Sequence, residues 1–287
     1  MLIHRLWMGL ILIALMIVLL SEGSWGQPYY PVFFCTISVA LLLATRELIM
    51  LLPQSDRPYF GIQYLGVGAH IAANWVNSFR EIPFPTEQIL AVQLAILVGF
   101  TILTLVLEMF CYGKRPNVLF RVGFTAFMLI YLGILPTFFI QARWFSPEKA
   151  LLALGLLVFV PKTNDIGAYF TGKFLTGKIL GRKQMAPTLS PKKTWQGFCG
   201  GMIIGTVFAV VFSQIYLPTA LSILQSTLFG VTVGLAGVLG DLAESLLKRE
   251  LGKKDASRTL PGFGGVLDLI DSLLFAAPIG YLWLIFH

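Results

Sequence analysis

Four aspartates stand within apolar stretches of the second half of the chain, where a lipid-facing helix could not keep a charge. They are Asp165, Asp241, Asp268 and Asp271. An aspartate at the centre of a membrane span costs about 2.5–3.5 kcal/mol, so such residues usually face a cavity or a charged partner. We therefore take these four residues as candidates for chemistry at or within a membrane.

Two groups of polar residues, each with two acids, have helical spacing. The first group, at positions i, i+3, i+4 and i+7, consists of Asp241, Glu244, Ser245 and Lys248. A helix would place all four on one face, and it would likewise place Asp268 and Asp271, three residues apart, on one face. Carboxylate oxygens that point in one direction suit a hard divalent cation such as Mg²⁺. The spacing therefore predicts a metal or substrate site.

Interpretations other than a metal site are open for these acids. They could neutralise Lys162, Lys248 or Arg249 in structural ion pairs, which is common for charges inside a membrane. The chain contains neither a Walker lysine loop nor the paired Cys and His spacing of a zinc site. Ser-His-Asp catalysis is disfavoured because every histidine lies outside the part of the chain that carries these acids. These are His4, His70 and His287.

Two basic loops accompany the acids, over residues 172–194 and 245–262. Their lysines and arginines supply positive charge for phosphate oxygens, and their glycines permit close backbone approach. Ser190 is expected to cap a helix that starts near Pro191, which would leave backbone N–H groups for an anion. Loops resting on anionic headgroups would also be basic. That alternative does not explain the interleaved glycines and acids.

The composition predicts an all-α polytopic membrane protein. Of 287 residues, 56% are hydrophobic and 12% are charged, about half the charge content of soluble domains. Nine stretches are candidate spans of about 20 residues: 7–21, 30–52, 60–79, 89–111, 117–140, 149–170, 196–217, 220–240 and 264–286. The weakest is 60–79, which carries several polar residues and would otherwise be an amphipathic segment.

Charge placement predicts the orientation of these spans. With nine crossings, 17 of the 21 lysines and arginines fall on the side of the N-terminus and three on the other. Because cytoplasmic loops carry excess Lys and Arg, the N-terminus is expected to be cytoplasmic. The first span lacks an Ala-x-Ala-like cleavage site and is taken as an uncleaved helix. The composition shifts near residue 160, after which two long basic loops alternate with carboxylates embedded in apolar sequence.

The second basic loop and the start of the last span fit a family signature in register. The matching residues are Ser245, Lys248, Arg249, Lys254, Asp255, Ser257, Leu260, Pro261, Gly264, Gly265, Asp268 and Asp271. Upstream matches lie at 165–169, Gly172, 190–195, Gly197 and 240–245. Over roughly residues 115–286 the chain resembles the phosphatidate cytidylyltransferase (CDP-diacylglycerol synthase) family. This resemblance implies N-terminal transmembrane helices over 1–114 and a catalytic transmembrane region over 115–287. Three positions depart from the signature: Gln196 replaces a glutamate, Phe263 a histidine and Leu269 an arginine.

The resemblance implies a reaction and a set of roles. CTP and phosphatidate would give CDP-diacylglycerol and pyrophosphate by in-line attack on the α-phosphorus, with no covalent protein nucleophile. Asp241, Asp268 and Asp271 would hold one or two cations, Mg²⁺ among them, and together with Lys248 would form the catalytic group. The residues expected to contact substrate are Asp165, Tyr169, Ser190, Lys192, Lys193, Glu244, Arg249, Lys254 and Asp255.

The expected partners are CTP and phosphatidate in the membrane, with no nucleic acid and with a homodimer left open. The expected location is the inner (plasma) membrane of a bacterium, with the active site at the cytoplasmic face. Two alternatives stay open at this point. One is a transporter or flippase for an anionic lipid or metabolite, and the other is a related cytidylyltransferase that acts on another lipid phosphate.

Overall fold

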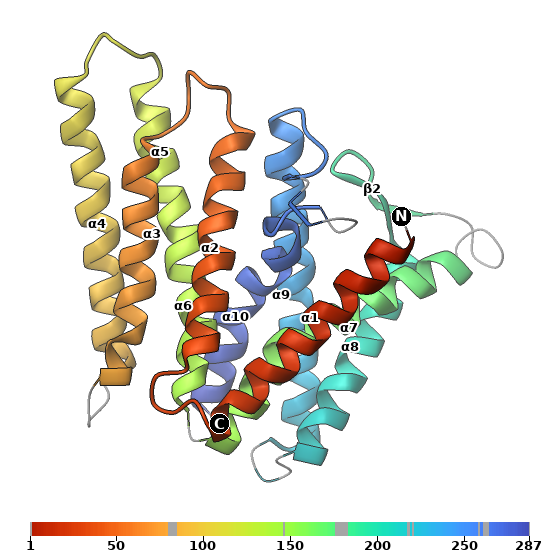
Figure 1. Cartoon of the computed structure of the whole chain (residues 1–287). Coiled ribbons are helices and arrows are strands. Elements are labelled where there is room, and N and C mark those ends of the chain that lie inside the picture. The colour runs from red at the N-terminus through yellow and green to blue at the C-terminus, as the bar shows by residue number, and fades with distance from the viewer. Residues whose placement is uncertain are drawn as a thin grey trace. The chain divides into compact units, whose positions relative to one another are not determined.

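The computed structural model describes residues 2–79, 85–145, 147–175, 183–216, 219, 221–257, 259–260 and 264–286. Helices account for nearly all of the regular structure (Figure 1). In chain order the α-helices are α1 (Leu2–Ser21), α2 (Pro31–Leu51), α3 (Phe60–Trp75), α4 (Thr86–Phe110), α5 (Val118–Leu129), α6 (Leu135–Gln141), α7 (Pro147–Leu175), α8 (Trp195–Tyr216), α9 (Ile223–Glu250) and α10 (Leu267–Phe286). The two strands are β1 (Gln184–Ala186) and β2 (Ser190–Thr194).

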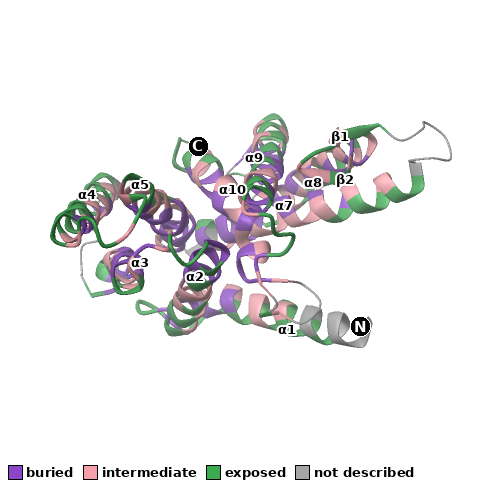
Figure 2. Ribbon diagram, turned by 90° about the horizontal axis from the view of Figure 1, so that it is seen from above, coloured by how far each residue is buried: buried purple, intermediate pink, exposed green. Residues whose placement is uncertain are grey.

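Seven helical segments within the described residues are long and apolar enough to cross a membrane. They correspond to α2, α4, the α5–α6 segment (Val118–Trp144), α7, α8, α9 and α10. The α4 helix is largely exposed along its length (Figure 2), as expected of a helix in contact with lipid. The expected class, an all-α integral membrane protein, is confirmed. The two other expected spans correspond to α1 and to α3, which has 16 residues.

The chain forms two compact units. One comprises Met1–Gln141 and Asp255–Leu269, and the other comprises Ala142–Lys254 and Ile270–His287. The first unit therefore includes part of the second basic loop and the first turn of α10. The division at residue 114, expected from the extent of the family resemblance, stays a prediction.

In the first unit, α2, α3, α4 and α5 lie side by side (Figure 1). The α2 helix begins with Pro31, whose missing N–H costs nothing at a helix start. The buried Glu22 carboxylate caps the same helix and accepts hydrogen bonds from the N–H groups of Val32 (2.7 Å) and Phe33 (2.8 Å). A carboxylate at this position satisfies orphan donors and complements the helix dipole.

In the second unit, α7 packs along α8, and α8 packs against α9. Glycines at four-residue spacing on α8 allow this approach to α7. A Cβ at Gly197 would come within 2.8 Å of the Ala168 backbone oxygen, and a Cβ at Gly205 would come within 3.2 Å of the Val160 backbone oxygen. Gly201, between them, faces Asn164 in the same way. Small residues at this spacing let helix backbones meet in membranes. This contact sets the positions of the polar residues on α7 and at the start of α8.

A short antiparallel hairpin replaces the expected helix start near Pro191. Residues 190–194 form β2, which pairs with β1, and α8 begins at Trp195. The expectation that Ser190 caps a helix is therefore wrong. The Thr194 hydroxyl takes the capping role and accepts a hydrogen bond from the Gly197 N–H at 3.1 Å. Strand pairing with residues 184–186 holds this segment extended, which the sequence of the segment alone did not reveal.

Candidate active site

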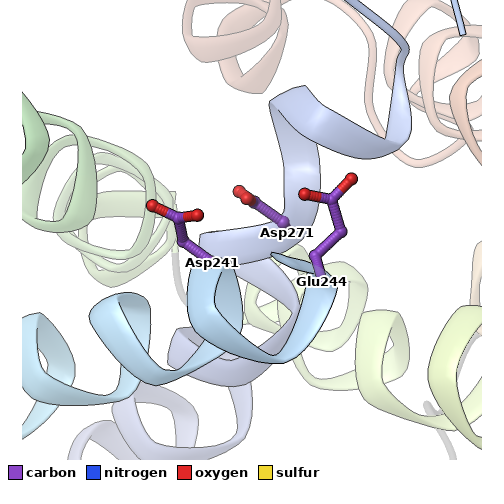
Figure 3. A group of neighbouring side chains, drawn as sticks. All are labelled: Asp241, Glu244 and Asp271. Carbon is purple, nitrogen blue, oxygen red and sulfur yellow. The ribbon is translucent and has the colours of Figure 1, made fainter. Parts of the chain in front are cut away.

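Three carboxylates of the second unit lie together (Figure 3). Asp241 and Glu244 come from α9, and Asp271 comes from α10. One oxygen of each lies within 4.8 Å of the other two. Glu244 is 1% exposed and Asp271 is 6% exposed, whereas Asp241 is half-buried. Three anionic oxygen donors from two helices form a group that a hard divalent cation could neutralise.

A close contact between α9 and α10 brings these acids together. Gly240 faces the backbone oxygen of Asp271 so closely that a Cβ at this position would clash with it. The next residue, Asp241, and the one a turn later, Glu244, therefore lie beside Asp271. The missing side chain of Gly240 thus has a geometric reason, since only glycine allows this separation.

Two lysines already pair with members of the cluster. The Lys193 Nζ lies 2.7 Å from the Asp241 Oδ2, and the Lys248 Nζ lies 2.5 Å from the Glu244 Oε2. The Lys248 pair spans one turn of α9, so the predicted shared face of Asp241, Glu244 and Lys248 is confirmed. Opposite charges at these distances offset the repulsion among the three carboxylates.

A cavity of about 500 Å³ opens beside Asp241 in the same unit. Five residues predicted from the sequence line it: Asp165, Tyr169, Lys192, Lys193 and Asp241. Its walls come from α7, the hairpin, the start of α8, and α9. The cavity has three lysines (Lys173, Lys192 and Lys193) and two aspartates among mostly apolar walls, and it is therefore suited to an anionic group attached to an apolar or aromatic one.

Asp165 lies near Lys162, which is on the same helix, α7. The Lys162 Nζ lies 3.8 Å from the Asp165 Oδ2 and donates a hydrogen bond of 3.0 Å to the hydroxyl of Ser272 on α10. Lys162 thus links α7 to the residue that follows Asp271. The sequence indicated Lys162 only as a possible counter-ion of the acids. The signal for its membership of the site was a charged residue inside an apolar stretch.

Asn164 is a further member of the site that sequence reasoning missed. It is buried, lines the cavity, and its Nδ2 donates to the Gly234 carbonyl of α9 at 3.0 Å. An amide is uncharged and common in many contexts, so its type gave no signal. Its charged neighbours Lys162 and Asp165 were the indications that this turn of α7 carries function.

The basic hairpin is tied to the end of α9 through Arg249. Its Nε donates to the Leu189 carbonyl at 3.2 Å, and its Nη1 donates to the Lys253 carbonyl at 3.1 Å. Arg249 therefore holds loop backbone in this structure. Ser190 lies in β2 opposite Ala186 and is not among the residues that line the cavity.

The remaining predicted residues are not among those that line the cavity. Lys254 and Asp255 are exposed. Asp268 belongs to the first unit, where its Oδ2 accepts hydrogen bonds from the N–H groups of Gly265 (2.6 Å) and Ala256 (3.3 Å). The ligand role expected for Asp268 stays a prediction. Of the three departures from the signature, Gln196 and Leu269 lie in the first turns of α8 and α10, and Phe263 lies outside the described residues.

Comparison with known proteins gives a consistent result. The model of the cytidylyltransferase family matches residues 3–287. A phosphatidate cytidylyltransferase of Thermotoga maritima is 34% identical over 255 residues, which are 86% of this chain and 85% of that protein. That of Bacillus subtilis is 39% identical over 164 residues, which cover 56% of this chain and 57% of that protein.

An uncharacterized protein of Escherichia coli, YnbB, is 40% identical over 149 residues, which are 52% of this chain and 45% of that protein. The chain therefore spans about half the length of two of these three relatives and most of the third.

Proposed function

Because this chain belongs to the cytidylyltransferase family, we propose that it is a phosphatidate cytidylyltransferase. It converts CTP and phosphatidate to CDP-diacylglycerol and pyrophosphate. The observation that carries the proposal is the cavity in which Lys192 and Lys193 face Asp165 and Asp241, with Asp241 also part of the three-carboxylate cluster. Lysines that bind phosphate and acids that bind a cation are the two groups this reaction needs.

The chain's own residues bind and orient the reactants. A phosphatidate oxygen attacks the α-phosphorus of CTP and forms a new P–O bond. The bond from this phosphorus to the oxygen that bridges to the β-phosphorus breaks, and pyrophosphate leaves with its electron pair. Lys192 and Lys193 hold phosphate oxygens, and Lys162 and Lys248 keep the acids in place. No side chain forms a covalent intermediate, because positioning and charge neutralisation suffice for phosphoryl transfer.

The cluster fits a divalent ion. Asp241, Glu244 and Asp271 offer only carboxylate oxygens, the donors that Mg²⁺ prefers. When bound there, Mg²⁺ would neutralise phosphate charge and stabilise the leaving group. Asp268 is proposed as a further ligand on the strength of the family signature alone.

We further propose nine spans with a cytoplasmic N-terminus, α1 and α3 being the two beyond the seven described above. The strong bias of lysine and arginine to one side supports this orientation. It places both basic loops, and therefore the cavity, at the cytoplasmic face of the bacterial inner membrane. There a soluble nucleotide and a membrane-held lipid can meet.

The decisive experiment incubates the purified protein in detergent with CTP, Mg²⁺ and phosphatidate. We expect release of pyrophosphate in equal amounts to CDP-diacylglycerol, and none when the lipid is omitted. A transporter would move its substrate across proteoliposomes without releasing pyrophosphate. Mass spectrometry of the products formed from a mixed lipid extract separates phosphatidate from another lipid phosphate.

Metal removal provides a further prediction. Chelation with EDTA is expected to abolish pyrophosphate release, and added Mg²⁺ is expected to restore it, because three clustered carboxylates cannot hold a triphosphate without a cation. Full activity in excess EDTA would remove the metal from the mechanism.

Replacing Lys193 with methionine should weaken substrate binding more than stability. Its ion pair with Asp241 is partly exposed to solvent, with side-chain exposures of 24% and 30%, so we expect a loss of at most about 1 kcal/mol in unfolding free energy. A charged hydrogen bond to phosphate contributes about 1.5–3 kcal/mol, so the KM for CTP or phosphatidate should rise by about tenfold or more. Unchanged KM values for both substrates would exclude Lys193 from phosphate binding.

A further inference from the structure

We propose that Glu47, on α2, is a positioning residue for the loop that precedes α10. This loop comprises residues 255–266, of which 255–257, 259–260 and 264–266 are described. This inference rests on the proposed function in one respect, namely that Asp271 on α10 belongs to a metal site. Glu47 lies outside the signature residues, which begin at Asp165. The signature loop and α2 nevertheless belong to the same compact unit.

Glu47 makes three hydrogen bonds to this loop. Its Oε1 accepts from the Ser257 hydroxyl at 2.6 Å and from the Val266 N–H at 3.0 Å, and its Oε2 accepts from the Leu267 N–H at 2.8 Å. The residue is 4% exposed. A buried carboxylate on an apolar helix is costly unless it is engaged by partners, and among the described residues its three hydrogen bonds come from the loop and the start of α10.

Two neighbouring glycines of the loop face carboxylates. A Cβ on Gly265 would come within 2.5 Å of the Glu47 Oε2, and one on Gly264, at φ +100°, would come within 2.6 Å of the Asp268 Oδ2. The glycine pair is therefore required for the two carboxylates to approach the backbone. Glu47 thus gives a structural reason for one half of the Gly-Gly step in the signature.

The contacts of Glu47 also set the start of α10. The N–H groups of Val266 and Leu267 are orphan donors at a helix N-terminus, and the Glu47 carboxylate satisfies both. Asp271 follows Leu267 by four residues, about one helical turn. A first turn held by Glu47 therefore holds the Asp271 carboxylate at a defined place on the helix, whereas a frayed turn would leave it in several positions.

Glu22 provides a matched control in the same unit. It too is a buried glutamate whose carboxylate accepts two backbone N–H groups at a helix start, that of α2. Its two partners lie 10 and 11 residues away in sequence, outside the signature segment of the chain. Any general effect of removing a buried capping carboxylate should therefore appear equally in both variants.

The experiment compares Glu47→Gln and Glu22→Gln with the unaltered protein in detergent. The first readout, independent of catalysis, is the rate of tryptic cleavage after Lys253 and Lys254, which precede the loop. The second is turnover as a function of Mg²⁺ concentration, with kcat and KM for CTP determined separately. Thermal unfolding of each variant is recorded alongside.

For Glu47→Gln we expect faster cleavage at the loop, and a fall in kcat or a rise in half-saturating Mg²⁺ of about tenfold or more, as for other groups that orient metal ligands. The KM for CTP should change far less. Glu22→Gln should leave loop cleavage and Mg²⁺ dependence unchanged. A Glu47→Asp variant, which keeps the carboxylate, should recover part of the loss.

Equal effects of the two glutamine variants would make Glu47 a cap that contributes only to stability and would overturn the inference. Wild-type cleavage and turnover in Glu47→Gln would overturn it as well. If the unaltered protein itself shows no pyrophosphate release, the proposed function fails, while faster loop cleavage in Glu47→Gln alone still supports the anchoring role.

Discussion

Asp271→Asn is expected to lower the rate of CDP-diacylglycerol formation by about 100-fold or more, since a metal-held charge contributes several kcal/mol to such a transition state. Asparagine has nearly the same shape, so the contact between α9 and α10 should persist. What is lost is the negative charge beside Asp241 and Glu244. The measurement is pyrophosphate release from CTP and phosphatidate in detergent, across a range of Mg²⁺ concentrations.

Asp56→Asn is the matched control for this change. Asp56 is an acid of the first unit that accepts a hydrogen bond from Asn117 at 2.8 Å, away from the carboxylate cluster in sequence and in role. We expect it to retain full activity. Equal activity of the Asp271→Asn variant and the unaltered protein would remove Asp271 from the metal site.

Gly240→Ala is the second change for which a large effect is expected. The added methyl group would meet the backbone oxygen of Asp271 and the side chain of Phe275, and a backbone oxygen within a helix cannot turn away. Overpacking of this kind costs about 1–3 kcal/mol in stability. It also pushes Asp271 away from Asp241 and Glu244, and a displacement of about 1 Å can cost about 100-fold in rate.

The same substitution at Gly99 on α4 serves as its control. A Cβ at Gly99 meets nothing within 4 Å, so the methyl group should be accommodated without loss of activity or stability. Thermal unfolding in detergent and pyrophosphate release are measured for both variants. A Gly240→Ala variant that is as active and as stable as Gly99→Ala would contradict the close contact between α9 and α10.

Features that depend on neighbours along one helix could be predicted from the sequence. The spacing of Asp241, Glu244 and Lys248 predicted a shared face, and the Lys248–Glu244 ion pair occupies it. Hydropathy predicted the segments that form the seven long apolar helices, because burial in lipid requires an apolar stretch of sufficient length. Both patterns are local in the sequence, and no knowledge of distant residues is needed to see them.

Features that depend on distant partners were harder to predict. Residues 190–194 contain a proline and a potential cap, which favoured a helix start, but pairing with residues 184–186 holds them as a strand. Asp268 and Asp271 are three residues apart on one helix, yet Asp268 accepts loop N–H groups while Asp271 joins acids from α9. No local pattern indicates Glu47, since its partners lie 210 to 220 residues further along the chain.

The amino-acid sequence by itself determined that this protein is an all-α membrane protein and which acids and lysines are candidates for its chemistry. Charges are so rare in its apolar segments that each one identifies a functional or paired position. Only the tertiary structure decided which of them meet. Helix crossings at Gly240, Gly201 and Gly205 set those meetings, and a crossing depends on two surfaces that fit each other, which no single stretch of sequence contains.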